Sequence, residues 1–209
     1  MRLSKSFFAR PTCEVARELV GCRLVHEHED GRLAGIIVET EAYTQGDPAC
    51  HGWHVVDRET GELNREARGY GLFKPPGTSY VYLIYGMYWL LNVVTEPEGV
   101  GGGVLIRAVR PEEGLESMYA RRVAARRDVD LANGPGKVAQ AFDVCERLHG
   151  QALLEPPVYF EHRPEGGDPL SITTSSRIGI TKAVERQWRY FLKDSPYVSP
   201  GTPSDLKRK

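Results

Sequence analysis

The sequence predicts an α+β fold: a single domain spanning residues 1–209, with a curved, largely antiparallel sheet, surrounding helices and a protruding β-hairpin. Strand-like runs rich in β-branched and aromatic residues follow one another across short turns, which is typical of antiparallel pairing. No regular alternation of strand and helix indicates a parallel βαβ arrangement, and no internal repeat is present. The chain has 209 residues, of which 41% are hydrophobic, and no Ser/Pro-rich linker divides it. It can therefore build one sizeable core.

The first elements expected are one helix and two strands. Residues 12–20 carry apolar side chains at helical spacing, with Thr12 as the expected cap and a glycine as the stop. Strands are expected at residues 23–28 and 33–42, because the sequence Glu29-Asp30-Gly31 between them favours a tight turn.

Residues 44–73 show no sustained periodicity, and an irregular segment of that length inside a domain is usually functional. Beyond it, the remaining elements expected are a hairpin at 79–94, a strand at 104–109, helices near 114–127 and 135–145, and short strands at 158–161 and 170–174.

Charge gives little indication of the partner. The chain has 27 basic and 28 acidic residues, so its net charge is −1. That balance argues weakly against nucleic acid without excluding a local basic face. The densest basic segment, residues 121–127, follows acidic residues at 112–116. Acid at the start and base at the end of a helix match its dipole, and we prefer this explanation to a dedicated DNA-binding patch.

Cysteine usage and hydropathy indicate a cytoplasmic protein. The four cysteines have no paired spacing, so neither a disulfide framework nor a zinc site is expected. The first residues lack the apolar run of a signal peptide, and no later segment is apolar enough to span a membrane. We expect no metal and no organic cofactor.

The hairpin at residues 79–94 has an unusual tip, Tyr85-Gly86-Met87, in which glycine supplies the left-handed turn residue. Hairpin tips are normally polar, so a tyrosine and a methionine there offer apolar surface outward. A rigid apolar tip suits insertion into stacked DNA bases, with an extruded base held in a pocket. The alternative is that both side chains fold back onto the protein's own core.

Two carboxylates are expected on one face of the strand at 33–42. Alternation places Glu39, Glu41 and Tyr43 together, with the two carboxylate-bearing residues roughly 7 Å apart along the strand. Charges on a strand often merely face water. This strand, however, leads directly into the irregular segment, where a site is expected.

Arg107 interrupts a run that otherwise predicts a buried strand. A buried guanidinium without an anionic partner is costly, so a carboxylate should lie nearby, and Glu39 and Glu41 are the candidates. Such pairing would keep a glutamate ionised, as a hydrolytic base must be, although a purely structural ion pair is an equal alternative.

Two other polar elements have weaker meaning. His51 has no second ligand at metal-binding spacing, so it reads as an ordinary loop histidine. Asn133-Gly-Pro-Gly-Lys137 lacks the spacing of a phosphate loop and more simply begins the helix at 135–145, with Pro135 in its first turn.

Motifs distributed along the chain complete the picture. They are Glu39-Thr-Glu-Ala-Tyr43, Asp47-x-Ala-x-His51, the stretch from Pro76 to Tyr88 with Leu91-Asn92, Val104-Leu-Ile-Arg-Ala108, Gly134-Pro-Gly-Lys137, Arg177-Ile-Gly-Ile180, Trp188-Arg-Tyr-Phe191 and Ser195-Pro-Tyr-Val-Ser199. In this order, from about residue 5 to 199, they resemble the motifs of the alkyladenine (3-methyladenine) DNA glycosylase family. The resemblance favours an outward-facing hairpin tip.

The resemblance implies a monofunctional glycosylase of base excision repair. Glu41 would be the general base that activates a water, Arg107 would contact that water, and the main-chain carbonyl of Ile178 would be its third ligand. Tyr85, with Met87 beside it, would enter the duplex and fill the gap left by the flipped nucleotide.

The resemblance also implies how the base is held. Tyr43, Tyr82 and His51 would sandwich the extruded base, and Asn92 would lie against its minor-groove edge, where it would clash with the exocyclic amine of guanine. Protonated His51 or a water would be the candidate acid for a neutral leaving base.

The implied substrates are alkylated or deaminated purines (3-methyladenine, 7-methylguanine and hypoxanthine) in double-stranded DNA, acted on by a monomer. Two alternatives stay open: a non-catalytic binder of damaged DNA, and a nucleoside hydrolase. Having both Glu41 and Arg107 speaks against a binder, and the exposed tip has no use in a nucleoside hydrolase.

One segment departs from the family's usual Thr-x-Arg-Asn-x-x-Met-Phe element. Gly69 replaces the asparagine and Leu72 replaces the methionine. Because this segment would border the base pocket, the departure concerns substrate range more than catalysis.

Overall fold

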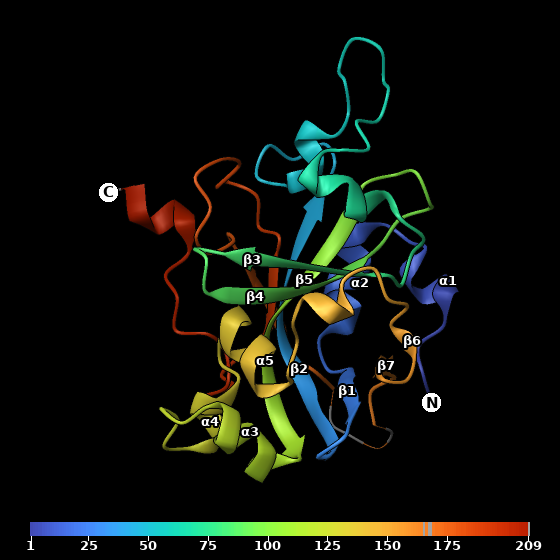
Figure 1. Cartoon of the computed structure of the whole chain (residues 1–209). Coiled ribbons are helices and arrows are strands. Elements are labelled where there is room, and N and C mark those ends of the chain that lie inside the picture. Colours follow the sequence, from blue (N-terminus) through green and yellow to red (C-terminus); the bar gives the residue numbers. More distant parts are fainter. Residues whose placement is uncertain (165, 167–168, 209) are drawn as a thin grey trace.

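The computed structural model, which describes residues 1–164, 166 and 169–208, is built on one antiparallel sheet (Figure 1). Its strands are β1 (Arg23–His28), β2 (Gly31–Thr44), β3 (Ser79–Ile84), β4 (Tyr88–Val94), β5 (Gly102–Glu113), β6 (Leu154–Glu155), β7 (Val158–Glu161), β8 (Ile172–Ser175) and β9 (Arg189–Leu192). The order is β3-β4-β5-β2-β1-β7-β6, and β9, paired with β8, also pairs with β2. The predicted α+β fold is confirmed.

Short helices surround the sheet. They are the α-helices α1 (Lys5–Phe8), α2 (Thr12–Leu19), α3 (Leu115–Arg121), α4 (Asp128–Leu131) and α5 (Pro135–Ala141), and the 3₁₀ helices η1 (His51–His54), η2 (Arg68–Phe73), η3 (Glu146–Leu148) and η4 (Ser204–Arg208). Within the described ranges, no helix is both long and apolar enough to cross a membrane.

The long central strand β2 is buried on both faces, which explains why its charges do not face water. Helix α2 packs against it, and the Thr40 hydroxyl donates to the Ala16 carbonyl across that contact. Register shifts around Glu39, where β2 pairs with β5, bend the strand. Glu39 and Glu41 are both fully buried in consequence, and the idea that they merely face solvent is wrong.

Several predicted boundaries need correction. Thr12 is the first residue of α2 rather than its cap, and its hydroxyl lies 2.9 Å from that of Thr95. The helix expected at 114–127 ends at Arg121, because Arg122 leaves helical geometry and its side chain turns back to the Leu131 carbonyl.

Two more elements are shorter or shifted. The helix expected at 135–145 ends at Ala141, and Asp143 soon afterwards adopts a left-handed conformation. The strand expected at 170–174 is β8, Ile172–Ser175. Pro135 lies in the first turn of α5, as predicted.

The predicted hairpin consists of β3 and β4 at the edge of the sheet, and Figure 1 shows it reaching out from the body. Its three-residue turn, residues 85–87, has left-handed φ values at both Tyr85 (53°) and Gly86 (68°), the geometry that matches strand twist. The exposed fraction is 80% for Tyr85 and 63% for Met87, so the tip points outward and the alternative of folding back onto the core is wrong.

The aperiodic segment 44–73 is folded without regular strands. Its two 3₁₀ helices, η1 and η2, bracket a loop that projects from the body in Figure 1. A small second core anchors it through Cys50, Val55, Leu72, Phe73, Tyr80 and Val94. Through Tyr80 this core fixes the segment beside the start of β3, next to the site described below.

Candidate active site

A cavity of about 630 Å³ opens between the hairpin, the segment after β2 and the start of α5. The residues that line it include most of those predicted for the site: Tyr43, His51, Tyr82, Tyr85, Asn92, Arg107 and Ile178. Two predicted residues are not part of its lining. Met87 points outward at the tip, and Glu41 lies immediately behind the wall.

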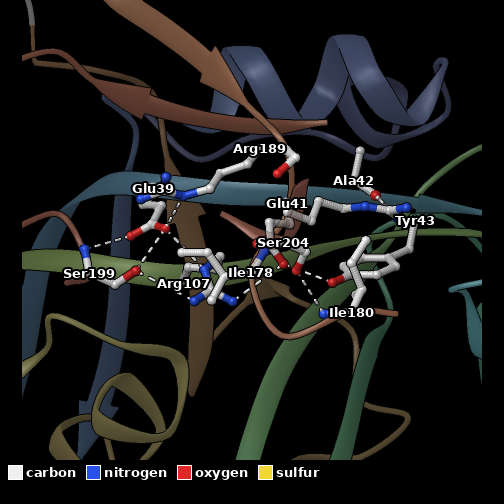
Figure 2. Close-up of polar contacts among 12 residues, drawn as sticks. Glu39, Glu41, Ala42, Tyr43, Arg107, Ile178, Ile180, Arg189, Ser199 and Ser204 are labelled. Carbon is white, nitrogen blue, oxygen red and sulfur yellow. Dashed lines mark hydrogen bonds and ion pairs between the residues drawn. The ribbon is translucent and has the colours of Figure 1, made fainter. Parts of the chain in front are cut away.

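Glu41 is held by three donors (Figure 2). Its Oε2 accepts hydrogen bonds from the Tyr43 hydroxyl at 2.7 Å and from Nη1 of Arg107 at 3.3 Å. Its Oε1 accepts the main-chain N–H of Ile178 at 2.7 Å. All three partners line the cavity, so Glu41 is one contact away from whatever the cavity holds. A carboxylate has about four acceptor positions, which leaves one for a further donor.

Glu39 lies in a different environment although it is only two residues away. Its Oε1 accepts from Nε of Arg107 at 3.0 Å, Nε of Arg189 at 2.6 Å and the Ser199 hydroxyl at 2.9 Å. Its Oε2 accepts the Ser199 main-chain N–H at 2.7 Å. Figure 2 shows these donors converging on the carboxylate. Glu39 therefore fixes Arg107, and of its three partner residues only Arg107 lines the cavity.

The electrostatics of Glu39 agree with that role. Burial alone would raise the pKa of the Glu39 carboxyl, but the charges of Arg107 and Arg189 and the Ser199 amide outweigh burial and hold the pKa below its ordinary value. The predicted pairing of Arg107 with both glutamates is confirmed, and its guanidinium is almost fully buried.

Aromatic rings form the opposite side of the cavity. The rings of His51 and Tyr82 touch edge to face, with centroids 4.6 Å apart. A base cannot lie between two touching rings, so this pair can supply one wall only. Burial and the nearby charge of Glu41 raise the pKa of the Tyr82 hydroxyl to about 12, and burial raises that of Tyr43 well above its ordinary value. Both tyrosines are therefore neutral at physiological pH.

His51 is poorly suited to be an acid. Burial, followed by the positive charges of Arg68 and His54, lowers the pKa of its imidazole below the ordinary value. Its Nδ1 lies 2.8 Å from the Tyr80 hydroxyl, which itself donates to the Arg68 carbonyl at 3.2 Å. The ring is therefore held neutral and fixed in place.

Asn92 lies on β4 inside the cavity and is 5% exposed. Its Nδ2 donates to the Tyr80 carbonyl at 3.0 Å, across the pairing of β3 with β4. This hydrogen bond fixes the direction of the amide.

Gly69, the departure noted in the sequence, has a steric reason. A Cβ added there would lie 2.3 Å from the His51 carbonyl oxygen and 2.5 Å from its carbonyl carbon. Only glycine lets η2 approach the backbone of His51 this closely. Leu72 lines the cavity and Gly69 lies against the backbone of His51, so both departures lie on the aromatic side of the cavity.

The side of the cavity formed by α5 is basic. Arg122 and Lys137 both line it, with the glycines that begin α5. Arg122 is anchored by the Gln140 side chain at 2.8 Å and the Leu131 carbonyl at 3.1 Å. Explaining the whole 121–127 segment by a helix dipole is therefore wrong, since Arg122 follows the helix and faces the cavity.

Sequence reasoning missed several residues of this site. Tyr80 lines the cavity and holds His51, while Arg189 and Ser199 complete the shell of Glu39. Arg177 and Asp47 form a fully buried ion pair behind Tyr43. Each of these lies within a quoted motif, but nothing in those motifs indicates what the side chain contacts. Over the described part of the chain, no group of three or more His, Cys, Asp or Glu residues is arranged to hold a metal ion.

The chain is similar to known proteins over almost all of its length. Residues 6–196 match the family model of methylpurine-DNA glycosylase (MPG). A protein of Salinibacter ruber is 55% identical over 204 residues, covering 97% of this chain and 98% of the relative. Relatives from Chlorobium phaeobacteroides (45% over 200 residues; 95% of each chain) and Methanoculleus marisnigri (43% over 201 residues; 95% of this chain, 99% of the relative) are also similar. All three are named as candidate 3-methyladenine DNA glycosylases.

Proposed function

The chain belongs to the methylpurine-DNA glycosylase family, and on that premise we propose that it excises damaged purines from duplex DNA by base flipping. It is a DNA glycosylase, a hydrolase of N-glycosyl bonds. The finer proposal is that it acts as one domain over residues 1–209, as a monomer, on 3-methyladenine, 7-methylguanine and hypoxanthine.

Entry into the duplex is assigned to the hairpin tip. Tyr85 and Met87 are strongly exposed on the three-residue turn of the hairpin, while Tyr85 also borders the cavity. An inserted tyrosine would fill the space that the flipped nucleotide leaves and so offset part of the unstacking free energy. Arg122 and Lys137 on the α5 side would attract the backbone phosphates beside that nucleotide.

Base recognition is assigned to the aromatic side of the cavity. The extruded purine would stack on Tyr43 with the touching pair of His51 and Tyr82 as the second wall. Asn92 would meet the minor-groove edge and exclude bases that carry the exocyclic amine of guanine there. Stacking on aromatic rings is worth about 1–3 kcal/mol per base.

Hydrolysis is assigned to Glu41 with Arg107 and Ile178. A water at the cavity floor would be held by Arg107 and the Ile178 carbonyl and would give its proton to the remaining acceptor position of Glu41. The carboxylate would also stabilise the positive charge that develops on the sugar. The observation that carries the proposal is that the three hydrogen-bond partners of Glu41 all line the aromatic cavity.

Whether hydrolysis requires a general acid depends on the charge of the leaving base. An alkylated purine is already cationic and leaves readily, whereas hypoxanthine must gain a proton as it departs. The lowered pKa of His51 speaks against protonated His51 as the donor and favours a water.

One comparison tests the proposal against its two alternatives. The release of hypoxanthine from duplex DNA is measured beside its release from free inosine, at equal concentrations. The proposal predicts release from the duplex only. A binder releases neither, and a nucleoside hydrolase acts on inosine; either result would contradict the proposal.

A further inference from the structure

Arg177 is the largest fully buried side chain of the described structure, and it does not line the cavity. Its Nη1 donates to the Ala42 carbonyl at 3.0 Å and to the carboxylate of Asp47, which is also fully buried. Its Nε and Nη2 are buried without any hydrogen-bond partner. A buried guanidinium with two unsatisfied nitrogens is costly, so the arrangement needs another explanation than ion pairing alone.

Two aromatic rings supply part of that explanation. The guanidinium carbon lies 4.6 Å from the ring centroid of Tyr43 and 5.3 Å from that of Trp188. A planar cation against aromatic faces is attracted by their electron density. Tyr43 lines the cavity and Arg177 does not, so the guanidinium contacts Tyr43 from behind the wall.

The residues that Arg177 contacts lie next to two parts of the proposed site, the Glu41 carboxylate and the segment that leads to His51. Tyr43 donates to Glu41 through its hydroxyl, and the residue after Arg177 donates its main-chain N–H to the same carboxylate. Asp47 begins the segment that leads to His51, and it accepts a hydrogen bond from the Ala49 N–H at 3.1 Å. One buried side chain thus joins β2, the 47–51 segment and the 177–180 segment.

We propose that Arg177 is a positioning residue: it fixes the ring of Tyr43 as the stacking wall for the extruded base while holding the Ile178 amide against Glu41. This inference rests on the proposed function, because it requires a base to stack on Tyr43. It assigns part of the affinity for the extruded base to a residue that is buried behind the cavity wall.

The test separates base stacking from DNA binding in general. Two duplexes differ at a single position, which carries either a 2′-fluoro hypoxanthine nucleotide, whose fluorine slows departure of the base, or a tetrahydrofuran abasic analogue that has no base. The dissociation constants of both duplexes are measured for the parent and for Arg177→Lys. The lysine keeps a charge for Asp47 but loses the planar group that lies against Tyr43.

We expect Arg177→Lys to bind the abasic duplex as the parent does and to lose at least about fivefold in affinity for the duplex that carries the base, the lower end of base–aromatic stacking. Arg186→Lys is the matched control. Arg186 lies 4.5 Å from the Trp188 ring centroid and 3.8 Å from Asp47. In the described structure it is Arg177, and not Arg186, that lies over the ring of Tyr43. Its ratio of the two affinities should stay at the parent value.

A second variant covers the case in which Arg177→Lys does not fold. Asp47→Asn keeps the shape of the anchoring side chain but weakens its hold on the guanidinium, and it should change the same ratio in the same direction. An unchanged ratio, or an equal loss for both duplexes, would overturn the inference because a merely structural residue behaves in that way.

Failure of the inference is distinguishable from failure of the proposed function. If the parent releases hypoxanthine from ordinary duplex DNA while the variants keep the parent ratio, only the role of Arg177 is wrong. If the parent releases none, the proposed function itself is contradicted.

Discussion

The tip of the hairpin and the end of β2 both present a tyrosine to the same cavity, but in opposite surroundings. Tyr85 is 80% exposed on a turn that contacts little else. Tyr43 donates to Glu41, lies against Arg177 and belongs to a strand that is paired on both sides. Tyr85 is therefore free to insert into a binding partner, whereas Tyr43 can only contact a group that has entered the cavity.

Because of this difference, substitutions at the hairpin tip should change activity without changing stability, whereas substitutions at the end of β2 should change both. At the tip, a side chain can be removed without opening the core, because it buries almost nothing in the free protein. Around Glu39, Glu41 and Arg107, removal of the Arg107 side chain takes away the cation that is paired with the buried Glu41 carboxylate. Substitutions in the two regions should therefore give different combinations of activity and unfolding free energy.

Arg107→Ala should have the largest effect and should lower both the activity and the free energy of unfolding. The substitution leaves Glu41 without its paired cation and leaves Glu39 paired with Arg189 alone. The expected loss in the free energy of unfolding is about 3–5 kcal/mol. Denaturant unfolding measures it, with Arg110→Ala as the control on the same strand, since the Arg110 side chain is 48% exposed. A loss no greater than that of the control would refute the coupling of site and fold at β2.

Tyr85→Ala should show the opposite combination. We expect single-turnover excision from a well-paired duplex to fall by the equivalent of a few kcal/mol, because nothing then opposes re-stacking of the flipped nucleotide. Excision from a mismatched or single-stranded substrate, where less unstacking is needed, should fall less. The free energy of unfolding should change by no more than about 0.5 kcal/mol. A large loss of stability with full duplex activity would show that the tip supports the core.

Asn92→Ser should change selectivity more than rate. A smaller side chain makes room for the exocyclic amine, so release of undamaged guanine should rise above the parent's negligible level, while release of alkylated adenine changes less. The two releases are measured on otherwise identical duplexes, so each is the control for the other. Equal guanine release from parent and variant would mean that guanine is rejected before it reaches the cavity.

The smallest effect expected concerns pH. Because the pKa of His51 is lowered in the folded protein, the neutral ring contributes stability that is complete above the ordinary histidine pKa of about 6.5 and is lost as pH falls toward the lowered value. The melting temperature of His51→Gln should therefore fall less steeply below that pH than the parent's. His54→Gln is the control, because His54 is exposed. Parallel curves for parent and His51→Gln would show that His51 titrates normally.

The sequence was most informative where the pattern of polar and apolar residues along one strand determines which side chains are buried together. Alternation placed Glu39, Glu41 and Tyr43 on one face of the strand. The position of Arg107 inside an apolar run predicted that it is buried and paired with these glutamates. The structure confirms both predictions. The sequence could not distinguish the two glutamates, because the further donors to Glu39 come from Arg189 and Ser199, far along the chain. Tyr80 and Arg177 were missed for the same reason, since their meaning lies in long-range contacts.

The predicted ends of helices and strands were wrong where side-chain contacts or strand pairing, rather than local propensity, decide the structure. The basic run after α3 satisfies a helix pattern, yet Arg122 leaves the helix to bind the Leu131 carbonyl and the Gln140 side chain. Strand β9 was not predicted as a strand, because its four residues are set by pairing with β2 and β8 rather than by their own pattern.

The central claim is that the two buried glutamates of β2 have different tasks, with Glu41 as the base. The most direct test is single-turnover release of hypoxanthine from duplex DNA by Glu41→Gln and Glu39→Gln, with binding of the same duplex measured in parallel. The account predicts that Glu41→Gln folds and binds but is slowed by at least about 100-fold, because the amide cannot accept the proton of the water. Glu39→Gln should instead lose mainly stability. A Glu41→Gln rate within about tenfold of the parent, or a greater loss of rate in folded Glu39→Gln, would contradict the account.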